Sequence, residues 1–154
     1  MKRAWTIGLI AVLVLGLVRL AAGQAGAASL DEQFLAAAKA GDAETVGALL
    51  DKGANIEARD NRGNTALMKA ALYGKVEMAR LLLARGASIE ARNNVKSTPL
   101  IGAAFFGNLE MVKLLLDKGG DIDARDMNGD TALTNAINQG NAEVAEYLRS
   151  KAAH

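Results

Sequence analysis

The chain has 154 residues, of which 51% are hydrophobic, 23% charged and only 4% aromatic, a composition typical of one small globular domain. It has no cysteine, which excludes a disulfide framework, a thiolate metal site and a cysteine nucleophile, and its one histidine is the last residue, His154. The formal net charge is +1, from 18 basic and 17 acidic residues, so the sequence predicts no broad basic surface for nucleic acid.

The N-terminal segment has the pattern of a secretory signal peptide. Two basic residues precede an apolar run at 4–18, which is short for a membrane span of about 20 residues. Small residues follow this run, and the pair Ala25 and Ala27 fits the small-x-small rule for cleavage. We expect the cut after Ala27, with the positions after Gly23 or Ala28 as alternatives.

This pattern predicts the domain organisation and the location of the protein. We expect a signal peptide at 1–27 that is removed on export to a bacterial periplasm, followed by a single domain at 28–154. Arg19 directly follows the apolar run and is untypical there, which favours an alternative in which the segment is retained as an inner-membrane anchor. Cleavage would remove Lys2, Arg3, Arg19 and no acid, so 15 basic and 17 acidic residues would remain, a net charge of −2.

A repeat of constant length runs through the rest of the chain. Glycine, threonine, leucine and glutamate recur at one fixed spacing, in the series Gly41, Gly74, Gly107, Gly140; Gly53, Gly86, Gly119; Thr65, Thr98, Thr131; Leu67, Leu100, Leu133; and Glu44, Glu77, Glu110, Glu143. Recurrence with a period of about 33 residues predicts a repeat architecture in which each unit packs on the next.

Each unit has the pattern of two short helices joined by a tight turn. Thr98 followed by Pro99 predicts the start of a first helix, because threonine can cap the backbone amides and proline needs no amide there. The glycine series that starts at Gly41 predicts its end, because glycine adopts the left-handed conformation that the reversal needs. The residues after these glycines are predicted to cap the second helix with their side chains: Asp42, Asn108 and Asn141.

The second helix of each unit carries an apolar stripe. Met78, Leu81 and Leu82 have the i, i+3, i+4 spacing of one helical face, and the same pattern recurs one period later. Between units, stretches such as 86–93 alternate briefly and contain turn residues, which predicts hairpin-like fingers. Because one unit cannot bury its stripe alone, stacking is expected to be essential. Arg149 replaces a leucine in the last copy and predicts a polar cap.

Two segments resemble ankyrin repeats: DNRGNTALMKAALYGKVEMARLLLARGASIEAR at 60–92 and NNVKSTPLIGAAFFGNLEMVKLLLDKGGDIDAR at 93–125. The segment 126–154 resembles a truncated copy, and 31–59 an opening copy without its first turn. The resemblance implies an all-α ankyrin-repeat solenoid of about four helix-turn-helix units linked by β-hairpin-like fingers, preceded by a hydrophobic N-terminal helix. The histidine of the family's Thr-Pro-Leu-His motif is absent from every copy.

The resemblance also implies a role in protein binding. Ankyrin stacks bind partners through a concave face built from the fingers and first helices, and the sequence contains no phosphate loop, dinucleotide fingerprint or nucleophile elbow. We therefore expect a non-catalytic, monomeric interaction module that binds an unidentified protein without metal or cofactor. Two alternatives are an inhibitor or immunity-like protein of a secreted enzyme, and a membrane-tethered scaffold if the N-terminal segment is retained.

Candidate contact residues follow from the positions that vary within the family. On the fingers and at the ends of the first helices these are Asn61, Arg62, Asn64, Leu72, Tyr73, Asn94, Val95, Ser97, Phe105, Phe106, Met127, Asn128, Asp130, Asn138 and Gln139. The aromatic residues among them have two interpretations, inter-repeat packing or an exposed hot spot for a partner.

Three arginines in one register form a second candidate feature. Arg59, Arg92 and Arg125 lie one period apart, and each follows an acidic residue by two positions. One interpretation is mutual neutralisation of these arginines and acids on a solvated surface. The other is a row of guanidinium groups that binds carboxylates of a partner.

Overall fold

The computed structural model describes residues 28–153, so the predicted signal peptide, its cleavage site and the N-terminal hydrophobic helix lie outside the described residues. Eight helices occupy this part of the chain: α2 (Leu30–Ala40), α3 (Ala43–Asp51), α4 (Ala66–Leu72), α5 (Val76–Ala84), α6 (Pro99–Phe105), α7 (Leu109–Asp117), α8 (Ala132–Asn138) and α9 (Ala142–Ala152). Within the same residues no helix is long and apolar enough to cross a membrane.

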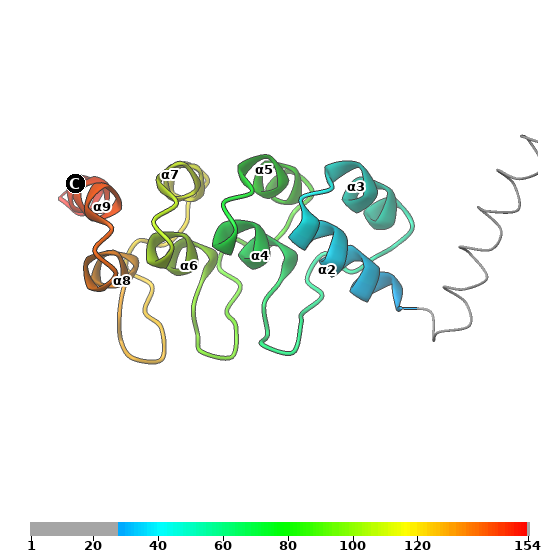
Figure 1. Ribbon diagram of the computed structural model, residues 1–154, viewed down its shortest axis with the longest axis horizontal. Coiled ribbons are helices and arrows are strands. Elements are labelled where there is room, and N and C mark those ends of the chain that lie inside the picture. The colour runs from blue at the N-terminus through cyan, green and yellow to red at the C-terminus, as the bar shows by residue number, and fades with distance from the viewer. Residues whose placement is uncertain (1–27, 154) are drawn as a thin grey trace, which may run out of the picture.

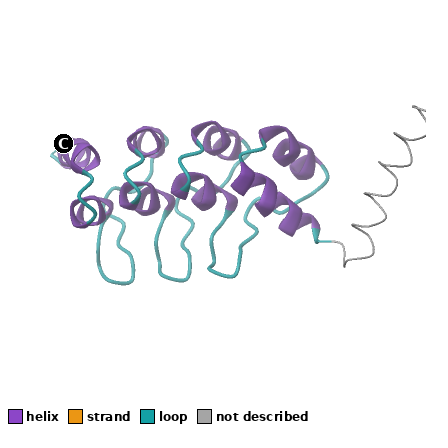
Figure 2. Ribbon diagram, in the orientation of Figure 1, coloured by secondary structure: helices purple, strands orange, loops and turns teal. Residues whose placement is uncertain are grey.

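The helices form two layers (Figure 1). One layer contains α2, α4, α6 and α8, here called the inner helices, and the other contains α3, α5, α7 and α9, the outer helices. Loops reach out from the inner layer before α4, α6 and α8, and we call them fingers. No residue of the described chain is in a β-strand, so the fingers reverse direction without a strand ladder (Figure 2). The predicted all-α stack of paired helices is confirmed.

The starts and ends of the inner helices follow the sequence pattern. The hydroxyl of Thr98 accepts a hydrogen bond from the amide of Ile101 at 3.3 Å, and Pro99 occupies the first turn of α6. Thr65 and Thr131 cap α4 and α8 in the same way. Beyond α6, Gly107 has a φ of +73°, the left-handed conformation that glycine adopts at little cost.

The predicted caps of the outer helices are only partly correct. Asp42 caps α3, because its carboxylate accepts a hydrogen bond from the amide of Thr45 at 3.0 Å. Asn108 and Asn141 precede α7 and α9 but make no side-chain cap bond. The prediction that these two asparagines act as caps is therefore wrong.

The asparagines instead connect neighbouring units. The side-chain amide of Asn141 donates hydrogen bonds to the carbonyl oxygens of Ala104 and Phe105, at 2.9 and 2.8 Å. Asn108 makes the same pair of bonds to the end of α4, at 3.0 and 3.4 Å. Each amide thus binds two helix-end carbonyls of the preceding unit, one of which also accepts a bond from the amide of the glycine that follows the helix.

The core runs continuously through the stack. Leu82 on α5 and Leu115 on α7 are 0% exposed, and they belong to one cluster that includes residues of all eight described helices. In the last unit the stripe continues as the buried Leu148, while the position of Leu83 and Leu116 becomes Arg149, which is exposed, as expected of a residue that caps the stack.

The fingers also bind one another. The amide of Asn94 donates to the carbonyl of Arg62 at 3.1 Å, and the amide of Met127 donates to the carbonyl of Val95 at 3.0 Å. These bonds join three successive fingers, so the tips that border the inner helices are held in register.

A strained fingertip gives a first test of this structure. Lys96 is the one non-glycine residue with positive φ in the described chain, at +57°, and glycine occupies its position in the other two fingers. Because glycine adopts this conformation without a Cβ penalty, Lys96→Gly is expected to raise the free energy of unfolding by about 0.5–1 kcal/mol. Urea denaturation measures this change. Gly129→Lys, at the same position of the next finger, is the reciprocal control and should lower stability; a loss of stability in Lys96→Gly would contradict the argument.

Candidate functional site

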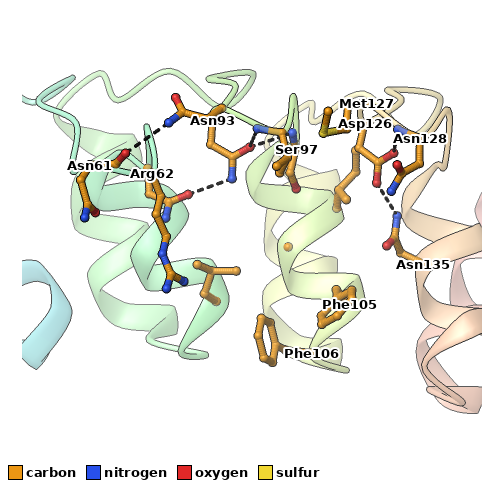
Figure 3. A pocket seen from close by; sticks show the side chains of 16 residues that line it. Asn61, Arg62, Asn93, Ser97, Phe105, Phe106, Asp126, Met127, Asn128 and Asn135 are labelled. Carbon is orange, nitrogen blue, oxygen red and sulfur yellow. Dashed lines mark hydrogen bonds between the residues drawn. The ribbon is translucent and has the colours of Figure 1, made fainter.

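A groove of about 560 Å³ opens between the fingers and the inner helices (Figure 3). Ten of its residues come from the fingers: Asn61, Arg62, Asn64, Asn93, Asn94, Val95, Ser97, Asp126, Met127 and Asn128. Six come from the inner helices and their C-terminal ends: Leu72, Ile101, Gly102, Phe105, Phe106 and Asn135. The groove thus spans three successive units.

Exposed apolar side chains gather at this groove. Six large hydrophobic residues are exposed in the described chain, and four of them line the groove: Val95, Phe105, Phe106 and Met127. Phe105 and Phe106 are 39% and 57% exposed, and their rings make an edge-to-face contact with centroids 5.1 Å apart. The exposure of both rings favours the interpretation as a contact surface over inter-repeat packing, since exposed clustered apolar side chains are typical of interaction sites.

A smaller cavity of about 250 Å³ adjoins the groove on the N-terminal side. It shares Arg62, Asn64 and Leu72 with the groove and adds Tyr73, which is 53% exposed, and Lys39. The two cavities together contain most of the contact residues that the sequence predicts on the fingers and inner helices.

Three residues predicted on the fingers and helix ends lie elsewhere. Asn138 and Gln139, at the C-terminal end of α8, are exposed, Asp130 is partly buried, and none of the three lines either cavity. Conversely, the sequence pattern did not identify five residues that line the groove: Asn93, Ile101, Gly102, Asp126 and Asn135. The signal that could have identified Gly102 is a glycine inside a helix at a position where neighbouring units carry larger side chains.

The arginine register has a structural role. Arg59 donates hydrogen bonds to the carbonyls of Gly63, at 2.9 Å, and of Arg92 in the next unit. Arg92 repeats this pattern with the carbonyl of Arg125 at 2.7 Å, and Arg125 binds the carbonyl of Gly129 at 2.7 Å. The guanidinium groups therefore brace the fingers and tie each unit to the next, and we do not include them in the proposed contact surface.

The acids of the same register also bind backbone. Glu57 accepts a hydrogen bond from the amide of Ser88 at 2.6 Å, and Glu90 accepts one from the amide of Asp121 at 2.7 Å. Among the ion pairs of the described residues, none joins these acids to the arginines. The interpretation that the two rows neutralise each other is therefore wrong.

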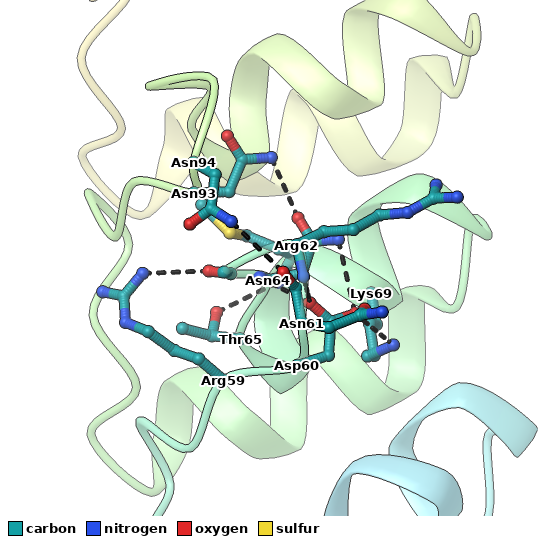
Figure 4. Close-up of polar contacts among 11 residues, drawn as sticks. Arg59, Asp60, Asn61, Arg62, Asn64, Thr65, Lys69, Asn93 and Asn94 are labelled. Atoms are coloured by element: carbon teal, nitrogen blue, oxygen red, sulfur yellow. Dashed lines mark hydrogen bonds and ion pairs between the residues drawn. The ribbon is translucent and has the colours of Figure 1, made fainter.

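One ion pair lies at the base of the first finger (Figure 4). The carboxylate of Asp60 is 2.7 Å from Nζ of Lys69, and both side chains are largely buried. The carboxylate also accepts hydrogen bonds from the backbone amides of Arg62 and Asn64, each at 2.9 Å. Burial alone would raise the pKa of Asp60, but the bond from Lys69, the two backbone amides and the charge of Lys69 outweigh it and lower that pKa.

The lowered pKa of Asp60 predicts an acid-dependent loss of stability. A carboxylate with a lower pKa in the folded state contributes stability above its unfolded value, near 3.8, and loses that contribution as the pH falls through the folded value. The free energy of unfolding should therefore fall more steeply below this pH in the wild-type protein than in Asp60→Asn, which cannot titrate. Urea denaturation at a series of pH values measures both curves, and parallel curves would contradict the assignment.

In residues 28–153 no group of three or more histidine, cysteine, aspartate or glutamate side chains is placed to hold a metal ion.

Comparison with known proteins identifies the repeats. A family model described as ankyrin repeats, in three copies, matches residues 18–93 and 89–154. No curated protein matches the chain. Because the matched segments cover most of the sequence and coincide with the stacked helix pairs, the chain belongs to the ankyrin repeat family.

Proposed function

We propose that this chain is a non-catalytic protein-interaction module of the bacterial periplasm that holds its partner in the groove. Ankyrin repeats typically mediate protein–protein binding, and their domains are generally not catalytic. The observation that supports the groove is its group of exposed apolar side chains, Val95, Phe105, Phe106 and Met127, on a rigid set of fingers and helix ends. Exposed aromatics with few rotatable bonds provide contact area at a low entropy cost.

Site-specific photo-cross-linking tests the binding face. A photoreactive phenylalanine analogue at position 106 should capture a discrete partner protein in the bacterium that makes this chain, because Phe106 stands exposed at the edge of the groove. The same analogue at Glu110, exposed on the outer helix α7, is the matched control and should not capture it. Equal capture from both positions, or capture from Glu110 alone, would contradict the proposal.

Affinity for the captured partner gives a quantitative version of the same test. Phe106→Ala is expected to weaken binding by about 1–2 kcal/mol, which corresponds to about 5- to 30-fold in the dissociation constant. Because Phe106 is more than half exposed, the thermal stability of the variant should be close to that of the wild-type protein. An unchanged dissociation constant would remove Phe106 from the contact surface.

The periplasmic location rests on the sequence of the segment 1–27 and has its own test. The protein recovered from a periplasmic fraction should begin within a few residues of Ala28 when its N-terminus is sequenced. It should also lack tryptophan fluorescence, because the one tryptophan of the chain, Trp5, lies in the segment expected to be removed. An intact N-terminus in the membrane fraction would instead favour the anchored alternative.

A further inference from the structure

The charge and polarity of the side chains along the groove change from the N-terminal to the C-terminal units. Two registers carry the change, one reading Lys39, Leu72 and Phe105 at the ends of the inner helices, and the other Arg62, Val95 and Asn128 on the fingers. In both registers a cation in the N-terminal part is followed by apolar side chains in the middle, and the register on the fingers ends with a neutral amide. A partner that fits this surface has to match the order of these three zones.

The cationic zone carries a net positive charge. The cavity beside Tyr73 is lined by Lys39, Arg62 and Lys69 and by a single acid, Asp60. The carboxylate of Asp60 is bound to Lys69 at 2.7 Å and is therefore already neutralised. Within residues 28–153 neither Lys39 nor Arg62 makes an ion pair. Two cations at the end of a partly enclosed groove attract negative charge.

The apolar zone has no polar side chain at one position of α6. In the second unit Lys69 occupies this position and binds Asp60, and in the fourth unit Asn135 occupies it and binds Asp126 at 3.2 Å. The third unit has Gly102 there. The middle of the groove is therefore lined by apolar side chains without the polar group that the neighbouring units carry.

The surroundings of Gly102 are apolar. A Cβ atom added there would lie 3.0 Å from Cδ2 of Leu72, and the groove walls nearby include Phe105 and Phe106. Gly102 is itself buried, and the side chain of Leu72 from the preceding unit packs against its backbone. The exposed apolar side chains that line the groove, Val95, Phe105, Phe106 and Met127, suit a bulky apolar side chain of a partner.

We infer that the groove binds a segment of a partner protein in which an aspartate or glutamate lies close to a bulky apolar residue. The apolar side chain packs against Val95 and Phe106, and the carboxylate pairs with Arg62 and Lys39. This inference rests on the proposed function, because it assigns a partner chemistry to the same groove. Charge complementarity at one end and an apolar pocket at the other together fix the direction in which the segment lies.

Selection from a phage-displayed library of random peptides on the immobilised full chain tests the inference. The enriched peptides should share an acidic residue near a bulky apolar residue. The peptide that the selection enriches most is then synthesised with a fluorescent label, and its binding is measured by anisotropy. Arg62→Glu and Lys39→Glu should each weaken binding by about tenfold or more, and replacing the peptide's acid by lysine should restore binding to Arg62→Glu.

Two further variants show whether a loss of peptide binding is specific to the groove or comes from a general change in the protein. Val95→Asn introduces the residue that the fourth unit carries at this exposed finger position and should weaken binding, because it removes an apolar contact. Lys118→Glu makes the same charge change at the exposed end of α7 and should leave binding unchanged. Circular dichroism and thermal unfolding confirm that each variant is folded.

The outcomes distinguish this inference from the proposed function. Enriched peptides without an acidic residue, or peptides that bind Arg62→Glu or Val95→Asn as tightly as the wild-type protein, would overturn it. If no peptide is enriched while cross-linking from position 106 still captures a partner, the inferred segment is wrong and the proposed binding face stands. If cross-linking from position 106 also captures nothing, the proposed function fails as well.

Discussion

Leu115→Ala is expected to lower the free energy of unfolding by about 2–5 kcal/mol, the range observed when a fully buried leucine is truncated. Leu115 is 0% exposed and lies at the centre of the third unit, on the stripe of α7 that faces the rest of the core. The substitution removes apolar contacts and leaves a cavity, and the closely packed helices around it can collapse only in part. Urea denaturation followed by circular dichroism measures the loss.

The loss of stability caused by Leu115→Ala should extend beyond the third unit. In a stack of repeats each unit is stabilised mainly by its neighbours, and typical domains have only about 5–15 kcal/mol of total stability. Loss of packing at an internal unit therefore weakens the attachment of the units on both sides. Leu116→Ala is the matched control, because Leu116 is the next residue of the same helix and is only partly buried. A larger loss in Leu116→Ala than in Leu115→Ala would contradict the assigned packing.

Local structure was largely predictable from the sequence. Thr98 with Pro99 marked the start of α6, and the glycine that follows this helix, Gly107, takes the left-handed conformation that its position predicted. Such features depend on a few neighbouring residues, so a single sequence contains the information for them. The apolar stripe of Leu82 was predictable for the same reason, because helical periodicity is a local pattern.

Contacts between units were not predictable in the same way. Arg59 could be placed in a register, but its two backbone acceptors, in its own finger and in the next unit, follow only from the folded stack. Phe105 and Phe106 are apolar, and nothing in the sequence shows whether the following unit covers them; the structure leaves both exposed. The surroundings of Gly102 were not predictable, because the sequence does not show which side chains of the neighbouring unit pack beside this position.

Asn141 illustrates this difference and gives the second prediction with a large effect. Its position after a glycine and before a helix is that of a side-chain cap, yet its amide donates to the carbonyls of Ala104 and Phe105 in the preceding unit. Asn141→Ala should lower the free energy of unfolding by about 1–3 kcal/mol, because the carbonyl of Phe105 loses its side-chain donor and that of Ala104 keeps only backbone donors such as the amide of Gly107. Urea denaturation measures this loss, and hydrogen exchange should show it first as faster opening of α8 and α9.

Asn141→Asp distinguishes a helix-capping role of this side chain from its role as a hydrogen-bond donor to the preceding unit. Aspartate caps a helix about as well as asparagine, so a capping role predicts little change in stability. A donor role predicts a loss at least as large as that of Asn141→Ala, because a carboxylate cannot donate and would face two carbonyl oxygens. Stability close to wild type in Asn141→Asp would therefore contradict the inter-unit contact. Since Phe105 is one of the two acceptors, the same variant should also loosen the end of α6 that borders the groove.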